Sequence, residues 1–181
     1  MANTCFYEIK VTGRKNDVDR IFKVLRNENN QERLIRQNLI SMDDVDRMDV
    51  ENNKIISRKG CGECDWSLAC SLCIDECREG TTNLKQLSQK YNVVIEVMSE
   101  ECGMEFCEHY LFNKGETVMD ETYDYQEIEL DDEDLTLDEF NKITEQDLTQ
   151  EEFNELRNKE SWYSYYGDPN RDFRDHFRYF K

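Results

Sequence analysis

Four cysteines near the middle of the chain form two CxxC pairs, Cys61 with Cys64 and Cys70 with Cys73. Each pair can form a knuckle whose two thiolates approach one Zn²⁺, and two pairs supply the four ligands of a tetrahedral site. The gap of five residues between the pairs is shorter than in most zinc ribbons. Cys70, Cys73 and Cys77 also share one helical stripe, where small thiols are buried without any metal. The spacing predicts either a compact zinc site or free buried thiols, and it does not match the usual iron–sulfur spacing.

Glu105, Cys107 and His109 alternate along one predicted strand and are the second group with reactive side chains. A thiolate, its base and an orienting acid need these three residue types. However, neighbouring positions on one face of a strand are about 6.5–7 Å apart, which is too far for a hydrogen bond between nucleophile and base. The sequence also contains no phosphate-binding glycine loop and no nucleophile elbow. We therefore predict a polar sheet face here, no catalytic residue and a protein that is not an enzyme.

The segment Thr82–Thr117 predicts the unit that positions these side chains. Leu84, Leu87 and Tyr91 are spaced as on one face of a helix, and Thr81 or Thr82 can cap its start, so a short helix is predicted. The β-branched run from Val93 to Met98 predicts a strand after it. A second strand then runs through Phe106 to Phe112, with a hairpin turn at Asn113–Gly115.

The first half of the chain predicts a similar set of elements. Thr4–Thr12 alternates as a half-buried strand, and a helix capped by Asn16 follows it. We expect a further short helix at 29–38, a loop or lid at 39–53 and a short strand at 54–58. This order predicts an α+β fold: a ferredoxin-like sandwich, with an antiparallel sheet and helices on one face. The expected domain is 1–130, with a cysteine-rich insert at 60–80 and an acidic edge strand at 117–130.

Residues 131–181 predict an acidic helical and aromatic extension. DLTLDEFN at Asp134 recurs 13 residues later as DLTQEEFN, and each copy contains a capping box, Thr136 with Glu139 and Thr149 with Glu152. Two short helices are therefore expected. The segment from Ser161 to Lys181 is aromatic and basic, so we expect it to pack on the body or to meet a partner.

Negative charge is concentrated in the second half of the chain. The net charge is −18, and residues 100–160 alone carry 22 acids and 4 bases. Such a field repels nucleic acid and attracts basic proteins. We predict that ordered carboxylates of the extension bind a basic partner; the candidates are Asp131, Asp132, Glu133, Asp134, Asp138, Glu139, Glu151, Glu152 and Glu155. The alternative is a solvated charged surface that only keeps the protein soluble.

Residues 1–125 carry a family resemblance. Five motifs resemble the YubB-like ferredoxin-like proteins of phages and plasmids. They are the opening Met-x-Asn-x-Cys, the Val-Thr-Gly ending at Gly13, Trp66, the LKQLSQKYN segment with the Glu-x-Gly step at Glu101, and the Phe-x-Glu-x-Tyr strand from Phe106. The chain departs from the family pattern at Ala2, Thr4 and Asn92. The resemblance implies the fold and an accessory protein of a mobile element, and it implies no catalytic residues.

Together these patterns predict a cytoplasmic protein of the host cell, because no long apolar run and no secretion signal is present. Its predicted function is to inhibit a basic nucleic-acid-binding host protein, as an anti-CRISPR or other anti-defence inhibitor does. Direct binding to nucleic acid or to a membrane is not expected. The alternatives are a small zinc-stabilised structural or interaction protein and a cysteine-dependent enzyme that uses Cys107.

Overall fold

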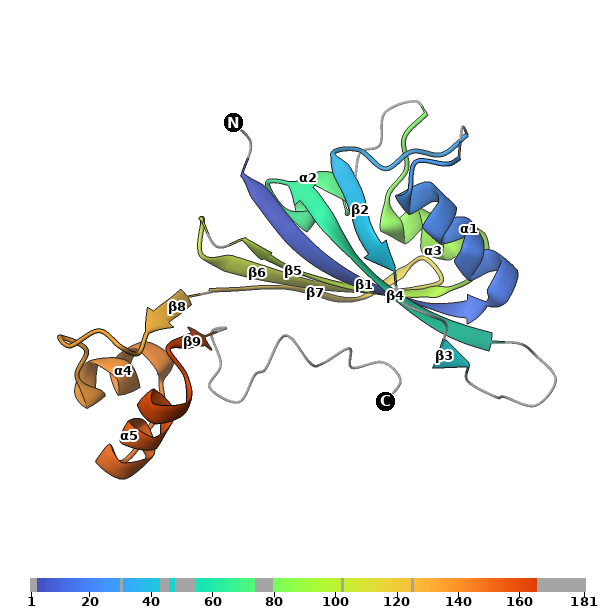
Figure 1. The fold of residues 1–181 in the computed structure, drawn as a ribbon. Coiled ribbons are helices and arrows are strands. Elements are labelled where there is room, and N and C mark those ends of the chain that lie inside the picture. Colours follow the sequence, from blue (N-terminus) through green and yellow to red (C-terminus); the bar gives the residue numbers. More distant parts are fainter. Residues whose placement is uncertain are drawn as a thin grey trace.

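The computed structural model describes residues 3–29, 31–42, 46–47, 55–73, 80–101, 103–124 and 126–165 (Figure 1). The described residues form an α+β sheet domain, residues 3–124, followed by a C-terminal module, residues 126–165. The strands of the sheet domain are β1 Thr4–Arg14, β2 Gln37–Met42, β3 Asp46–Arg47, β4 Ile55–Asp65, β5 Val94–Glu101, β6 Phe106–Asn113 and β7 Glu116–Asp124.

Within the described residues these seven strands form one sheet, in the order β2-β4-β1-β5-β6-β7, with β3 beside β4. Every pair is antiparallel. The turn between β6 and β7 is the predicted hairpin, in which Lys114 has φ of 52° and Gly115 has φ of 93°. Glycine adopts this left-handed conformation without the steric cost of a side chain.

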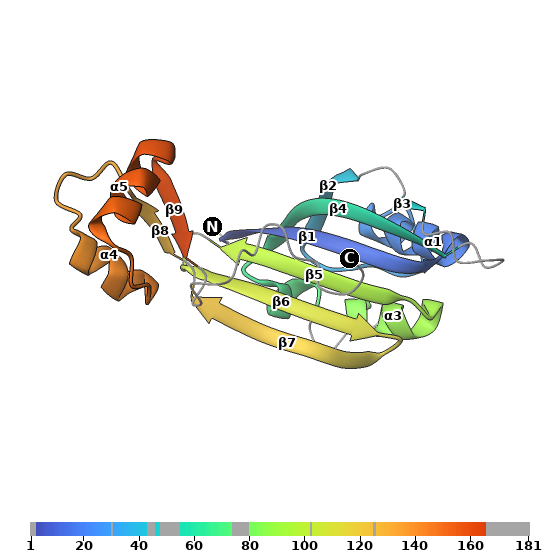
Figure 2. The ribbon, with the colours of Figure 1, turned by 90° about the horizontal axis from the view of Figure 1, so that it is seen from below.

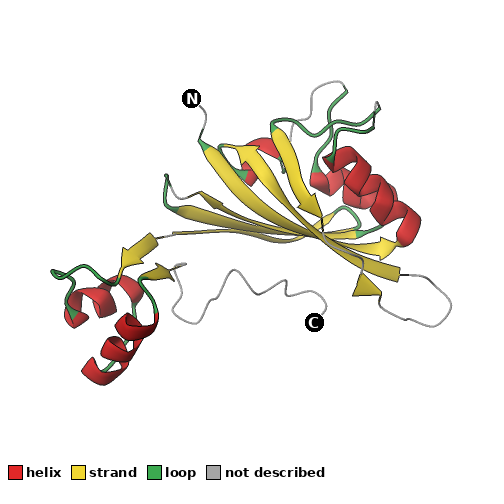
Figure 3. Cartoon of the chain, viewed as in Figure 1, coloured by secondary structure: helices red, strands yellow, loops and turns green. Residues whose placement is uncertain are grey.

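Three helices, α1 Lys15–Leu25, α2 Leu68–Ser71 and α3 Leu84–Tyr91, lie on one face of the sheet (Figure 3). We call it the helix face, and the opposite one the open face. The apolar side chains of α1 at helical spacing are fully buried, as is Leu84 of α3; in α1 they are Val18, Ile21, Phe22 and Leu25. These side chains pack on the inward residues of β1 and β5, among them Ile9 and Val97. An amphipathic helix on one apolar sheet face therefore explains the main core.

Several predicted elements differ from the structure. The helix expected at 29–38 is wrong: residues 31–36 are irregular, and Gln37 begins β2. Leu34 is buried, but a left-handed Arg36 interrupts the backbone, and the Gln37 side chain donates to the Leu25 carbonyl. Consequently part of the expected loop at 39–53 is strand, and the rest, apart from β3, lies outside the described residues.

The caps and the strand ends also differ. The cap of α1 is Arg14 rather than Asn16, and that of α3 is Asn83, whose side chain accepts from the Gln86 amide. The strand expected at 54–58 continues to Asp65. The single edge strand expected at 117–130 is instead β7 followed by a separate strand, β8 Gln126–Glu129.

No helix in the part of the chain that the structure describes is long and apolar enough to cross a membrane.

Candidate functional site

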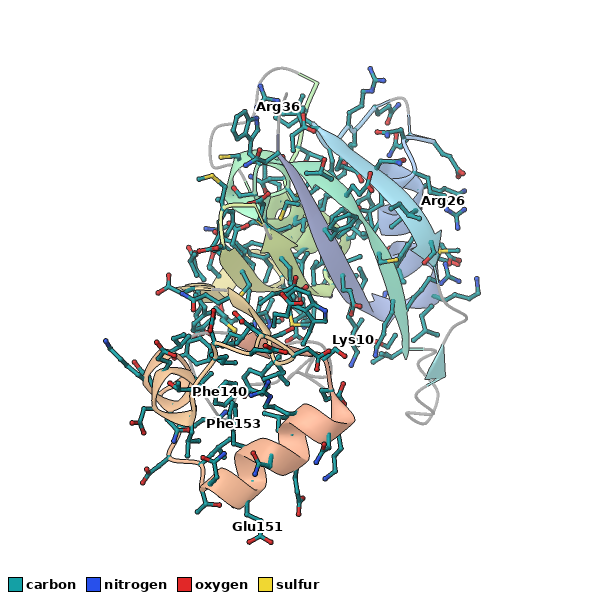
Figure 4. The ribbon with its side chains drawn as sticks, turned by 60° about the vertical axis from the view of Figure 1, so that its left-hand side comes forward. Lys10, Arg26, Arg36, Phe140, Glu151 and Phe153 are labelled. Atoms are coloured by element: carbon teal, nitrogen blue, oxygen red, sulfur yellow. The ribbon has the colours of Figure 1, made fainter. Side chains whose placement is uncertain are left out.

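The C-terminal module is built from a two-stranded ribbon and two short helices. Strand β8 pairs with β9 Trp162–Tyr165, and between them lie α4 Leu137–Thr144 and α5 Gln150–Lys159. Phe140 and Phe153 are buried and face each other, with ring centroids 5.2 Å apart (Figure 4). Ile128 and Leu130 complete this core. Because β8 contributes to it, the module defined by packing starts at Gln126, before the expected boundary at 130.

Both predicted capping boxes are formed. The Thr136 hydroxyl accepts from the Glu139 amide at 3.3 Å, and the Glu139 carboxylate accepts from the Thr136 amide at 3.2 Å. Thr149 and Glu152 repeat this arrangement at the start of α5. The side-chain hydrogen bond from Thr136 lowers the pKa of Glu139, and the backbone hydrogen bond from Thr149 lowers the pKa of Glu152. The helices of the 13-residue repeat therefore start at fixed positions.

Polar contacts hold the two helices and the ribbon in one arrangement. The Asn141 side chain donates to the Leu148 carbonyl at 3.0 Å and accepts from the Leu148 amide at 3.1 Å. The Arg157 guanidinium donates to the Asp132 carbonyl at 3.1 Å, which ties α5 to the turn after β8. The carboxylates on these elements are consequently displayed on an ordered surface.

All nine predicted partner-binding acids are exposed on this module. Glu139 and Glu152 are engaged in the capping boxes, and Glu155 lies 3.3 Å from Lys159. The carboxylate of Asp132 accepts from the Asp134 amide. Within the described residues no hydrogen bond or ion pair is found for the side chains of the others, which are Asp131, Glu133, Asp134, Asp138 and Glu151. Figure 4 shows Glu151 pointing away from the phenylalanine core.

The charge of the module is strongly negative. Residues 126–165 contain 14 acids and 3 bases, which gives a net charge of −11 over 40 residues. The described carboxylates lie around a small apolar core rather than on an extended chain. A basic protein surface is the partner that this field attracts.

The structure does not bring together the four cysteines for which a zinc site is predicted. Cys61 and Cys64 both lie in strand β4, where the register pairs Cys61 with Glu8 and Cys64 with Cys5. Residues three apart in a strand point to opposite faces, so these two sulfurs cannot bind one ion in this sheet. Within the described residues no group of three or more His, Cys, Asp or Glu side chains is arranged to hold a metal. Cys77 lies outside the described residues.

The free-thiol alternative agrees with the described cysteines. Cys5, Cys64 and Cys107 are buried, and no described cysteine forms a disulfide. A hydrogen bond with Cys5, followed by burial, raises the pKa of the Cys64 thiol. The neutral thiol is therefore the favoured form of Cys64 in this structure. Cys70 is exposed within α2, and Cys73 is partly buried just after the end of that helix.

The Glu105, Cys107 and His109 group is also not assembled. Glu105 lies in the turn before β6, whereas Cys107 and His109 are buried on the open face. The His109 Nε2 atom lies 2.8 Å from the Glu96 Oε1 atom. The predicted polar face is therefore buried, and its histidine pairs with a residue that sequence reasoning did not single out.

Glu108 is a second buried group that the sequence did not reveal. Its two carboxylate oxygens accept from the Leu68 amide at 2.6 Å and from the Ala69 amide at 3.1 Å, and Ser99 donates to it at 3.1 Å. Burial raises the pKa of Glu108, although these hydrogen bonds oppose the rise. The available signal was an acidic residue inside the mostly apolar strand FCEHYLF.

Replacing Thr149 by alanine is expected to destabilise the module by about 1 kcal/mol, because the Glu152 amide loses its acceptor. Chemical denaturation followed by Trp162 fluorescence measures this change. The lowered pKa of Glu152 adds a pH dependence: its contribution is present above the unfolded pKa and is lost as pH falls through the folded pKa. In Thr149→Ala that acid-dependent loss should be smaller, and an unchanged pH profile would contradict the assignment.

Comparison of the chain with protein-family models, with curated protein sequences and with solved structures finds no match.

Proposed function

We propose that this protein is an acidic, non-enzymatic binding protein whose C-terminal module docks on a basic, nucleic-acid-binding partner protein. The observation that supports it is the display of carboxylates on a small folded core. Asp131, Glu133 and Asp134 lie in the turn between β8 and α4, and Glu151 lies in the first turn of α5. Charges at fixed positions lose less conformational entropy on binding than charges on a loose chain.

Electrostatics favours a protein partner over nucleic acid. A net charge of −11 on the module opposes approach of a phosphate backbone. The same field accelerates encounter with a cationic surface and selects the partner by charge. A protein surface that binds nucleic acid carries the dense positive charge that this module complements. Occupation of that surface would inhibit the partner, which is the activity that we propose.

The proposed fold family and origin of the protein rest on its strand order and on the resemblance of residues 1–125 to YubB-like proteins. The order β2-β4-β1-β5, with α1 between β1 and β2 and α3 between β4 and β5, supports a ferredoxin-like sandwich extended by β6 and β7. Because the YubB-like proteins occur in phages and plasmids, the resemblance supports an origin on a mobile element as part of this proposal. In this context we propose an anti-defence inhibitor, for example of a CRISPR or restriction protein, acting in the host cytoplasm.

The two alternatives receive less support from the described residues. A zinc-stabilised scaffold needs four converging cysteines, and Cys61 and Cys64 point to opposite faces of the sheet. An enzyme based on Cys107 needs an accessible thiol, whereas Cys107 is fully buried and His109 is paired with Glu96. We therefore retain the binding protein as the single proposal.

Neutralising four exposed carboxylates of the module tests the proposal. In the variant Asp131→Asn, Glu133→Gln, Asp134→Asn and Glu151→Gln, the affinity for the basic partner is expected to fall about tenfold, at roughly 0.3–0.5 kcal/mol for each exposed ion pair. The measurement is quantitative capture from host extract at low salt, with captured proteins identified by mass spectrometry. Captured proteins should bind nucleic acid, and added nucleic acid should displace them.

A matched variant separates position from net charge. Glu28→Gln, Glu105→Gln, Glu116→Gln and Asp124→Asn change the charge equally at exposed positions of the sheet domain. Capture is expected to remain close to that of the unmodified protein. If both variants capture less partner to the same extent, only the net charge of the protein matters and not the position of the charges. If both variants capture the partner as well as the unmodified protein does, the module has no role in binding.

A further inference from the structure

Cys5 and Cys64 lie directly opposite each other on neighbouring strands of the sheet domain. The register of β1 and β4 pairs them, and both side chains belong to the core on the helix face. Figure 2 shows the two strands side by side along their length. Cys61 and Cys107 lie opposite residues of other types. Within the described strands, Cys5 and Cys64 are therefore the one pair of cysteines at directly opposite positions.

The backbone geometry of this pair suits a disulfide. Two residues away, the Trp66 amide donates to the Asn3 carbonyl at 2.9 Å. Hydrogen-bonded pairs recur at every second position of an antiparallel ladder, so Cys5 and Cys64 also form such a pair. The Cα atoms of a hydrogen-bonded pair lie about 5.5 Å apart. Disulfides span Cα separations of roughly 4.4–6.8 Å, so the two strands already have a separation at which the bond can form.

The side chains of the pair also meet. The thiols of Cys5 and Cys64 share a hydrogen bond, so the two sulfur atoms face each other across the strands. Both belong to the same core as Leu68 and Leu72, which come from α2 and from the residue that follows it. Neither cysteine is in a disulfide, so the pair differs from a cross-link only by two hydrogen atoms.

We propose that Cys5 and Cys64 are a redox-sensitive pair that forms a disulfide between β1 and β4 when the protein is exposed to a peroxide. Hydrogen peroxide first oxidises one thiol to a sulfenic acid and releases one water. The second thiol attacks this sulfur and expels a second water, which leaves the S–S bond. The two thiols thus lose two hydrogens and two electrons, and the O–O bond of the peroxide is reduced to two waters. A dithiol reductant reverses the reaction by thiol–disulfide exchange.

The cross-link stabilises the sheet domain. Cys5 lies near the start of β1 and Cys64 near the end of β4, so the bond closes the segment that contains α1 and β2 into a loop. Closing a loop restricts the unfolded chain and thereby favours the folded state. The raised pKa of Cys64 favours the neutral thiol, whereas the thiolate is the reactive form, so the pair responds to sustained rather than brief oxidation. This inference concerns the sheet domain and does not rest on the proposed function of the C-terminal module.

Disulfide mapping of the unmodified full chain tests the proposal. The reduced protein is treated under native conditions with a dose of hydrogen peroxide that modifies the exposed Cys70. Remaining thiols are then blocked with N-ethylmaleimide in denaturant, and fragment-ion mass spectrometry locates each linkage. A linkage between Cys5 and Cys64 is expected, and dithiothreitol should restore both thiols. Unchanged far-UV circular dichroism during the treatment shows that the linkage forms in the folded protein.

Two matched variants connect the linkage to stability. Cys64→Ser removes one partner, whereas Cys107→Ser removes another buried cysteine that has no thiol opposite it. Peroxide should lower the unfolding equilibrium constant, measured in urea, about a hundredfold in the unmodified protein and in Cys107→Ser. Cys64→Ser should show no such change, and its Cys5 should remain a free thiol. If Cys64→Ser does not fold, mapping of the unmodified chain decides.

The proposal is wrong if Cys5 and Cys64 both remain thiols at a peroxide dose that modifies Cys70. It is equally wrong if Cys5 forms a linkage with a different cysteine, or if the linkage to Cys64 appears only after the chain has unfolded. A covalent dimer held by these cysteines would refute a pair within one chain.

Discussion

Replacing Phe140 by alanine is expected to unfold the C-terminal module while the sheet domain stays folded. Phe140 is fully buried and contacts both Phe153 and the ring of Tyr163, each with centroids 5.2 Å apart. Truncating a buried phenylalanine costs about 3–5 kcal/mol. A unit of 40 residues has a free energy of unfolding of roughly 2–6 kcal/mol, so the loss is comparable to the whole stability of the module.

Amide hydrogen exchange measures this result residue by residue. Amides of α4 and α5 should lose protection, and those of β1 and β5 should retain it. Ile143→Ala is the matched control, because Ile143 lies on the same helix and is 38% exposed. It should leave the module folded. Loss of protection in both parts of Phe140→Ala would instead show that module and sheet unfold as one unit.

The Phe140→Ala variant also tests whether partner binding needs carboxylates at fixed positions or only their negative charge. Phe140→Ala keeps all 14 acids of the module but removes the core that positions them. If recognition needs fixed geometry, capture of the basic partner should fall by at least the tenfold expected for the neutralised variant. Undiminished capture by the unfolded module would refute the requirement for order, although it would leave electrostatic attraction intact.

Local signals predicted the helices of the module because the information lies within four residues. Thr136 and Glu139 satisfy each other across one helical turn, and Thr149 and Glu152 do the same. The hairpin at Lys114 and Gly115 was predictable for the same reason, since a two-residue turn depends on its own backbone angles.

The length of strand β4 was underestimated because its glycines are needed for packing against residues that are distant in the sequence. Gly60 and Gly62 flank Cys61, and this composition suggested a loop with a metal knuckle. In the structure a side chain at Gly62 would collide with the Asn38 carbonyl and with the Tyr7 ring. The glycine is therefore needed for close packing of β2 and β1 against β4, which depends on residues 24 and 55 positions away in the sequence.

Strand β9 was missed for a similar reason. Trp162–Tyr165 pairs with β8, which lies 33 to 39 residues earlier, and nothing in either segment specifies the other. The aromatic composition instead suggested a continuous terminal segment. The Glu96–His109 pair is likewise formed across two strands, so neither residue shows its partner in the local sequence.

Replacing Glu108 by alanine is expected to destabilise the sheet domain by about 3 kcal/mol. The substitution leaves the Leu68 amide, the Ala69 amide and the Ser99 hydroxyl without the carboxylate that accepts from all three. A buried donor that loses its acceptor costs about 1–3 kcal/mol, and the three groups are close enough for their costs to overlap. Urea unfolding followed by circular dichroism measures the loss.

The raised pKa of Glu108 also predicts how the stability loss changes with pH, which packing alone does not. Burial raises the pKa of Glu108 in the folded state, so the folded protein binds that proton more tightly than the unfolded chain does. Its contribution to stability is present below the unfolded pKa and is lost as pH rises through the folded pKa. The stability difference between the unmodified protein and Glu108→Ala should therefore narrow as pH is raised from about 4 to 7. A difference that widens with pH would instead mean that the three hydrogen bonds outweigh burial at Glu108.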